Sequence, residues 1–110
     1  MVEIVGTTIT MTRGDTLDVP VKIMKNDGTE YEIQSGDQVR FAMKKKYDDA
    51  NPLIMKTLDN EDLRIVVEPL ETSQLDYGDY VYDVKLIKEN GEKDTFINMA
   101  KIVITREVYL

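Results

Sequence analysis

The sequence contains no cysteine, no histidine and no tryptophan, and it has only two phenylalanines among 110 residues. Without cysteine and histidine the chain forms no disulfides, thiol nucleophiles, imidazole catalysts or Cys/His zinc sites. No nucleophile motif compensates for these absences. We therefore expect no enzymatic activity and no catalytic, cofactor-binding or metal-ligating residues.

Long apolar runs and basic segments are also missing. No apolar run approaches the length of about 18 residues that a membrane-spanning helix needs. The chain carries 14 basic and 21 acidic residues, a net charge of −7, and so lacks the basic face that binds nucleic acid or anionic membranes. Residues 1–6 show no basic region followed by an apolar stretch, so we expect no signal peptide.

What the sequence does have is apolar–polar alternation of period two, which predicts strands. One stretch, residues 70–76, has a helical pattern, and Thr72 is expected to cap it. Asp27-Gly28 and Asn90-Gly91 predict tight turns, and Pro20 predicts an edge strand or a bulge. The apolar phase shifts near Ala100, which indicates either one bulged strand or two strands. The predicted strands are 7–11, 16–24, a short one at Tyr31 and Ile33, 38–45, 53–58, 63–68, 79–87 and 94–107.

This pattern predicts a single all-β domain over residues 1–110, built as an antiparallel sandwich or small barrel of seven to eight strands. The run from Asp76 to Tyr82, with Gly78 and Tyr80 between, fits the tyrosine corner of immunoglobulin-like domains. In such a corner the tyrosine ring packs inward and its hydroxyl returns to the backbone of the preceding loop. The motif favours an Ig-like Greek-key β-sandwich, with Tyr80, Asp76 and Gly78 as structural residues.

Other motifs have ordinary structural interpretations. Arg13-Gly14-Asp15 spells the integrin-binding tripeptide, but a turn explains it. Lys44–Lys46 next to Tyr47 could contact phosphates or bases, but we interpret these lysines as a solvated strand end in an acidic chain. Carboxylates near residues 48, 61 and 76 leave a calcium-dependent adhesion module as an alternative. Loop tyrosines such as Tyr47 leave a carbohydrate-binding module as another.

Much of the chain resembles one known family. Residues 7–105 are similar to the Ig-like N-terminal domains of baseplate upper proteins from phages of Gram-positive bacteria. The match rests on residues that shape turns and strands. It is carried by the runs Met11–Thr16, Val19–Val21, Asp27-Gly28, Gly36-Asp37, Val39–Lys44, Leu53–Lys56, Glu71-Thr72 before Leu75, and Gly78–Val84.

The resemblance implies a non-enzymatic phage or prophage structural protein of the tail, baseplate or head. Its partners would be other virion or prophage structural proteins, with homo-oligomers possible, and no nucleic acid or membrane. It would be made in the bacterial cytoplasm and then enter the virion. The receptor-attaching proteins continue beyond this module, so we expect a free-standing piece or a trimmed fragment.

Strand edges suit such assembly because they offer unpaired backbone groups. We expect the edges at residues 7–11 and in the C-terminal strand. Contact residues are expected at Tyr47 and at the apolar end Val108-Tyr109-Leu110.

Overall fold

The computed structural model describes residues 2–5, 7–25 and 27–106, and within them it contains eight strands and one short helix. The fold is therefore mostly β, as the alternation predicts. The elements are β1 (Val2–Val5), β2 (Thr8–Thr12), β3 (Leu17–Pro20), β4 (Gln38–Lys44), β5 (Ile54–Thr57), β6 (Arg64–Val67), α1 (Pro69–Thr72), β7 (Gly78–Ile87) and β8 (Lys93–Thr105).

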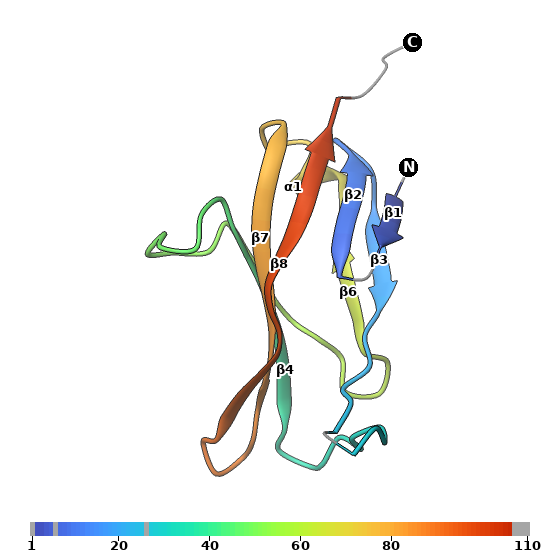
Figure 1. Ribbon diagram of the computed structural model, residues 1–110, viewed down its shortest axis with the longest axis vertical. Helices are drawn as coiled ribbons and strands as arrows, with labels where there is room; N and C mark the ends of the chain where they lie inside the picture. Colours follow the sequence, from blue (N-terminus) through green and yellow to red (C-terminus); the bar gives the residue numbers. More distant parts are fainter. Residues whose placement is uncertain (1, 6, 26, 107–110) are drawn as a thin grey trace.

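The strands form two sheets that share one core. The larger sheet has six strands in the order β1-β2-β8-β7-β4-β5, and the smaller one pairs β3 with β6. Figure 1 shows β7 and β8 running along the molecule, with β3 and β6 in a separate pair to one side. Alternate residues of both sheets point inward, so Phe41 and Val84 of the larger sheet and Ile65 of the smaller one are almost fully buried. The architecture is sandwich-like.

One strand pair departs from the expected antiparallel arrangement. β2 lies parallel to β8, with Ile9 opposite Ile102, whereas every other strand pair among the described residues is antiparallel. Parallel neighbours need a long connection, and here most of the chain lies between the two strands. Local alternation cannot reveal the direction of a pairing between segments this far apart, so the prediction of a purely antiparallel fold is wrong at this pair.

The stretch with the shifted apolar phase is one bulged strand. Tyr82 lies opposite Ala100 and Val84 opposite Ile97, so β8 holds one residue more than β7 between these pairs. The extra residue brings Met99 to φ 56°, the left-handed region, which side chains rarely adopt. The bulge predicted near Ala100 is therefore confirmed.

Three local expectations need correction. Tyr31 and Ile33 lie in no strand: next to them is only an isolated bridge between Met24 and Glu30. The buried Asp37 carboxylate accepts hydrogen bonds from the Tyr31 hydroxyl and the Gln34 N–H, both at 2.8 Å. Thr72 does not cap the helix: it is buried in the last turn, where its hydroxyl donates to the Asp15 carbonyl at 2.8 Å. The cap is Glu68, which forms a capping box with Glu71. The third difference is strand β1, because no strand is predicted before residue 7.

The turn predictions hold. Residues 13–14 form a turn, with Gly14 at φ 87° and the Asp15 N–H donating to the Thr12 carbonyl at 3.1 Å. Gly28 and Gly91, at φ 88° and 92°, occupy the two tight turns that need a left-handed residue. Pro20 lies on β3, which pairs only with β6 among the described strands. β3 is therefore an edge strand, where a residue without an N–H is tolerated.

Tyr80 makes the contact that a tyrosine corner requires. Its ring is 2% exposed, and its hydroxyl donates to the Asp76 carbonyl at 2.7 Å. Burial, and then the nearby Asp76 charge, raises the pKa of the Tyr80 hydroxyl. Lys45 Nζ lies 4.4 Å from the centre of the same ring. The corner therefore ties the start of β7 to the loop that precedes it.

We expect Tyr80→Phe to lower the free energy of unfolding by about 1 kcal/mol, because it removes this hydrogen bond and leaves a carbonyl unpaired. Urea denaturation followed by circular dichroism measures the change. Tyr77→Phe is the matched control, since this exposed neighbour makes ring contacts with Arg13 and Arg106 that survive the change. Equal effects of the two substitutions would show that the Tyr80 hydroxyl has no special role.

Candidate functional site

The larger sheet ends at β5, whose outer side has no strand partner among residues 2–5, 7–25 and 27–106. On its inner side β5 pairs with β4, with Met55 opposite Ala42. The Leu53 N–H points toward β4, because it donates to the Met43 carbonyl at 2.8 Å. The Leu58 N–H also points toward β4, because it donates to the Val39 carbonyl at 2.8 Å, and the register continues this alignment with Lys56 opposite Phe41 and Ile54 opposite Met43. Successive backbone groups alternate in direction along a strand, so the groups of Met55 and Thr57 point to the open side. This edge can accept another strand.

Large apolar side chains surround this edge. Leu53 is 54% exposed, Met55 59% and Leu70 of α1 75%. Leu53 and Leu70 also line one groove together with Ile54 and Leu75. Of the described strands that end a sheet and whose side chains can be assessed, β3, β5 and β6, only β5 carries an exposed large apolar residue. The β5 edge thus combines free backbone groups with apolar surface, which is typical of a protein-contact site.

The one charged residue on β5 is neutralised within the chain. Lys56 Nζ lies 2.8 Å from a Glu71 carboxylate oxygen, and about a third of each side chain is exposed. The hydrogen bond from Lys56 lowers the pKa of the Glu71 carboxyl below its ordinary value. A lysine on an edge strand usually discourages pairing with another strand. Here Glu71 compensates its charge, so this protection is weakened.

The lowered pKa of Glu71 predicts a pH dependence. The contribution of the pair to stability is complete above the ordinary pKa of 4.5 and is lost as the pH falls through the lowered folded value. Because the pair is partly exposed, we expect Lys56→Met to cost under about 1 kcal/mol at pH 7. The difference between wild type and Lys56→Met should shrink below about pH 4, as measured by urea denaturation. A difference that grows on acidification would contradict this assignment.

A row of residues crosses the outer face of the larger sheet from this edge. Met55 lies opposite Ala42, Ala42 lies opposite Asp83, and a carboxylate oxygen of Asp83 accepts the Met99 N–H at 3.2 Å. The Tyr47 hydroxyl donates to the Met99 carbonyl at 3.1 Å. Two side chains therefore hold the left-handed bulge, which presents Met99 to solvent at 57% exposure.

Substitutions at Met99 should follow its backbone conformation. Met99→Gly is expected to leave the free energy of unfolding unchanged or to raise it, because glycine adopts positive φ without strain. Met99→Ile should lower it by about 1–2 kcal/mol, because left-handed backbone is costly for a β-branched residue. Thermal and urea unfolding would give the values. Met24, similarly exposed but not left-handed, is the control. There isoleucine should be tolerated better than glycine.

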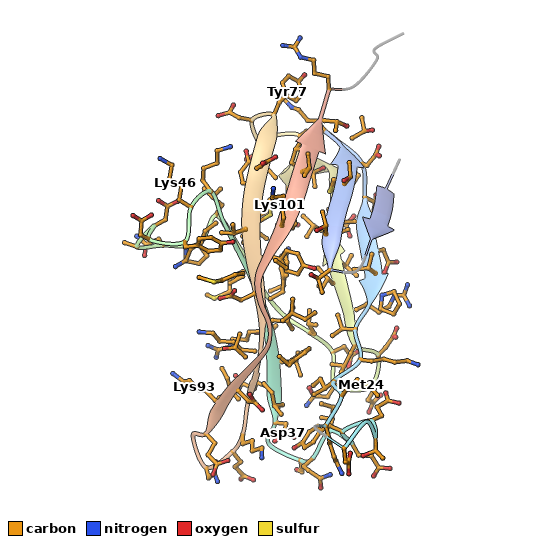
Figure 2. The ribbon with its side chains drawn as sticks, in the orientation of Figure 1. Met24, Asp37, Lys46, Tyr77, Lys93 and Lys101 are labelled. Atoms are coloured by element: carbon orange, nitrogen blue, oxygen red, sulfur yellow. The ribbon has the colours of Figure 1, made fainter. Side chains whose placement is uncertain are left out.

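The interaction residues predicted from the sequence have mixed outcomes. Tyr47 is exposed, in the segment between β4 and β5 that projects from the body of the molecule, as its neighbour Lys46 shows in Figure 2. Val108, Tyr109 and Leu110 lie outside the described residues. The expected edges are wrong: β2 lies between β1 and β8, and β8 lies between β2 and β7. The backbone groups of both strands are bonded inside the sheet. β1 pairs with one side of β2, and β8, from near the other end of the chain, pairs with the opposite side.

The basic run at the end of β4 is largely engaged in internal contacts. Lys44 Nζ donates to the Asp49 carbonyl at 2.9 Å, and Lys45 Nζ donates to the Asp79 carbonyl at 3.1 Å. Lys46 is exposed. Such contacts fit a structural role for this run better than a surface for phosphates or bases.

Two observations bear on the alternatives of carbohydrate binding and calcium-dependent adhesion. Tyr31 bonds to Asp37 at one end of the molecule, whereas Tyr77 lies at the opposite end, so these tyrosines share no sugar-binding groove (Figure 2). Among residues 2–5, 7–25 and 27–106, no three carboxylates gather where they could hold a metal ion.

Comparisons with protein-family models, characterised proteins and solved structures returned no match. In the described part of the chain, no helix has the length and apolar character needed to cross a membrane.

Sequence reasoning missed Leu53 and Leu70 as surface residues. Each follows a proline, Pro52 and Pro69, and neither belongs to a strand of clear alternation. A large apolar residue placed directly after a proline, outside the alternating pattern, was the available signal.

Proposed function

We propose that this chain is a non-enzymatic assembly module of a phage or prophage particle, built as an Ig-like Greek-key sandwich. It contacts other structural proteins of the tail, baseplate or head through a sheet edge. Its place of action is the virion after synthesis in the bacterial cytoplasm. The resemblance of residues 7–105 to baseplate modules supports the viral assignment, and the exposed backbone and apolar groups of the sheet edge support the assembly role.

The strand order supports the Ig-like part of this proposal. β3 and β6 pair in one sheet while β4, β7 and β8 lie in the other, so the chain passes repeatedly between the layers. Tyr80 at the start of β7 follows the connection from β6, which is where an Ig-like domain has its tyrosine corner.

The open β5 edge is the observation that carries the assembly role. A partner strand laid along β5 would bond to the outward backbone groups of Met55 and Thr57. Its alternate side chains would reach Met55 on one face and the Leu53–Leu70 groove on the other. Backbone hydrogen bonds would supply affinity, and the apolar contacts would supply specificity.

The direct test is the location of the protein. Particles released from the source bacterium are banded on a density gradient, analysed by mass spectrometry and labelled with antibodies raised against this chain. We expect the protein to band with the particles at a constant ratio to their major structural protein. A protein that stays in the soluble fraction while complete particles band without it would overturn the proposal.

Edge variants test the site. We expect Leu53→Lys and Leu70→Lys together to reduce incorporation into particles at least tenfold, because both side chains are exposed and their charge would be placed against the partner. Met24→Lys, an exposed methionine at another end of the fold, should leave incorporation unchanged (Figure 2). Circular dichroism checks that all variants fold.

A further inference from the structure

We infer that copies of this chain associate head to tail, with a basic patch on the outer face of the larger sheet held against the acidic loops of the next copy. The basic patch is defined by Arg40, Lys85 and Lys93, and the acidic loops by Glu30, Glu32 and Glu61. This contact uses surfaces other than the β5 edge, so it goes beyond the proposed function and does not depend on it.

Two cations of the basic patch lie directly opposite each other. Arg40 of β4 pairs with Lys85 of β7, and both side chains point away from the core, because the residues before and after each of them are buried. Lys93 of β8 is exposed on the same face, opposite Ile87. Like charges at opposed positions of neighbouring strands destabilise a sheet. A carboxylate placed between them from outside would relieve this repulsion.

No carboxylate of the described residues forms an ion pair with these three cations. The row that holds Arg40 and Lys85 continues to Thr57 of β5 and Thr95 of β8, both exposed. Guanidinium, ammonium and hydroxyl groups all donate hydrogen bonds, and a carboxylate is the side chain that accepts them best. Asp83, in the next row, already accepts the Met99 N–H. The face therefore matches carboxylates that come from another molecule.

An excess of carboxylates lies on the opposite side of the molecule. Residues 13–37 and 58–73, which include β3 and β6, carry 4 basic and 11 acidic residues, whereas the rest of the chain carries 10 of each. The entire net charge of −7 thus belongs to these two segments. Figure 2 shows Lys93 on one side of the molecule and Met24, which forms a backbone bridge with Glu30, on the other.

The carboxylates of the acidic loops come together around one groove. Glu30, Glu32 and Glu61 all line it, and Lys22 is the only cation among the lining residues. All three glutamates are exposed, and within the described part of the chain none of them forms an ion pair. Each copy therefore presents three uncompensated carboxylates on one side and three uncompensated cations on the other.

This distribution of charge determines how two copies meet. Patch against patch, or loops against loops, would place like charges together, whereas patch against loops pairs cations with carboxylates. Because the two surfaces lie on opposite sides, a copy that is engaged at one keeps the other free. Such a heterologous contact continues into a ring or an open filament. A second copy fits the patch because the same chain supplies both halves of the contact.

Sedimentation equilibrium of the unmodified protein gives the first test. Exposed ion pairs are individually weak, so we expect association only at about tens of micromolar and above. In about 20 mM NaCl the weight-average mass should reach at least twice the monomer mass by about 300 µM. In about 0.5 M NaCl, which screens charges beyond about 4 Å, it should return to the monomer mass. A strict monomer in low salt, or association that salt does not weaken, would overturn the inference.

Paired charge reversals test the two surfaces. We expect Arg40→Glu with Lys85→Glu to abolish association, and Glu32→Lys with Glu61→Lys to do the same. An equimolar mixture of the two variants should associate again, because each then offers a surface that complements the other. The net charges become −11 and −3, both negative, so overall attraction cannot produce this recovery. A mixture that stays monomeric would contradict the assigned contact.

Matched variants separate this contact from other effects. Lys46→Glu with Arg106→Glu also gives a net charge of −11 but leaves the patch intact, so it should associate like the wild type. An equal loss there would mean that net charge acts rather than the patch, and would reject the inference. Circular dichroism checks that every variant folds.

Particle incorporation distinguishes this inference from the proposed function. Leu53→Lys with Leu70→Lys alters the β5 edge and should keep the association. Association that is lost in this variant would move the contact to the β5 edge and reject the patch. A wild-type protein that is monomeric in low salt but needs Arg40 and Lys85 to enter particles would reject self-association and assign the patch to another acidic protein.

Discussion

The burial of one face of the six-stranded sheet against only two strands is the constraint on which the rest of the structure depends. Phe41, Val84 and Ile102 are inaccessible to solvent because β3 and β6 supply the opposing layer. Two strands cannot cover six, so other segments complete the cover. The residues from α1 to Leu75 lie near β5, where Glu71 holds Lys56 and Leu75 shares a groove with Ile54. Where this cover ends, apolar surface is left exposed.

The strands that end the two sheets differ in how well they could accept another strand. On β3, Pro20 lacks an N–H, so this edge offers a partner strand one donor fewer. On β5, the lysine that would repel a neighbour is neutralised by Glu71. A chain that avoided contact at β5 would gain from a proline or an unpaired charge there, and β5 has neither.

Features that depend on local chemistry could be predicted from the sequence, and features that depend on distant pairing could not. The turns at Gly28 and Gly91, the bulge near Ala100 and the Tyr80 hydrogen bond each follow from a few adjacent residues. The parallel pairing of β2 with β8 joins residues near opposite ends of the chain, and alternation carries no information about it. The candidate site could not be predicted for the same reason. Which strands end a sheet depends on the topology, and the strands expected as edges, at residues 7–11 and 94–107, lie inside the larger sheet.

The pairing of Ile9 with Ile102 also bears on how the protein is made. β2 is synthesised early but has no neighbour on its β8 side until residues 93–105 have left the ribosome. The larger sheet therefore stays incomplete until β8 has been synthesised, and its apolar face lacks its final partner until then. Contacts between such distant residues slow folding, because the loop between them must be ordered first. The complete sheet thus forms only after β8 has been made, and until then β2 keeps an open side on which another strand could pair.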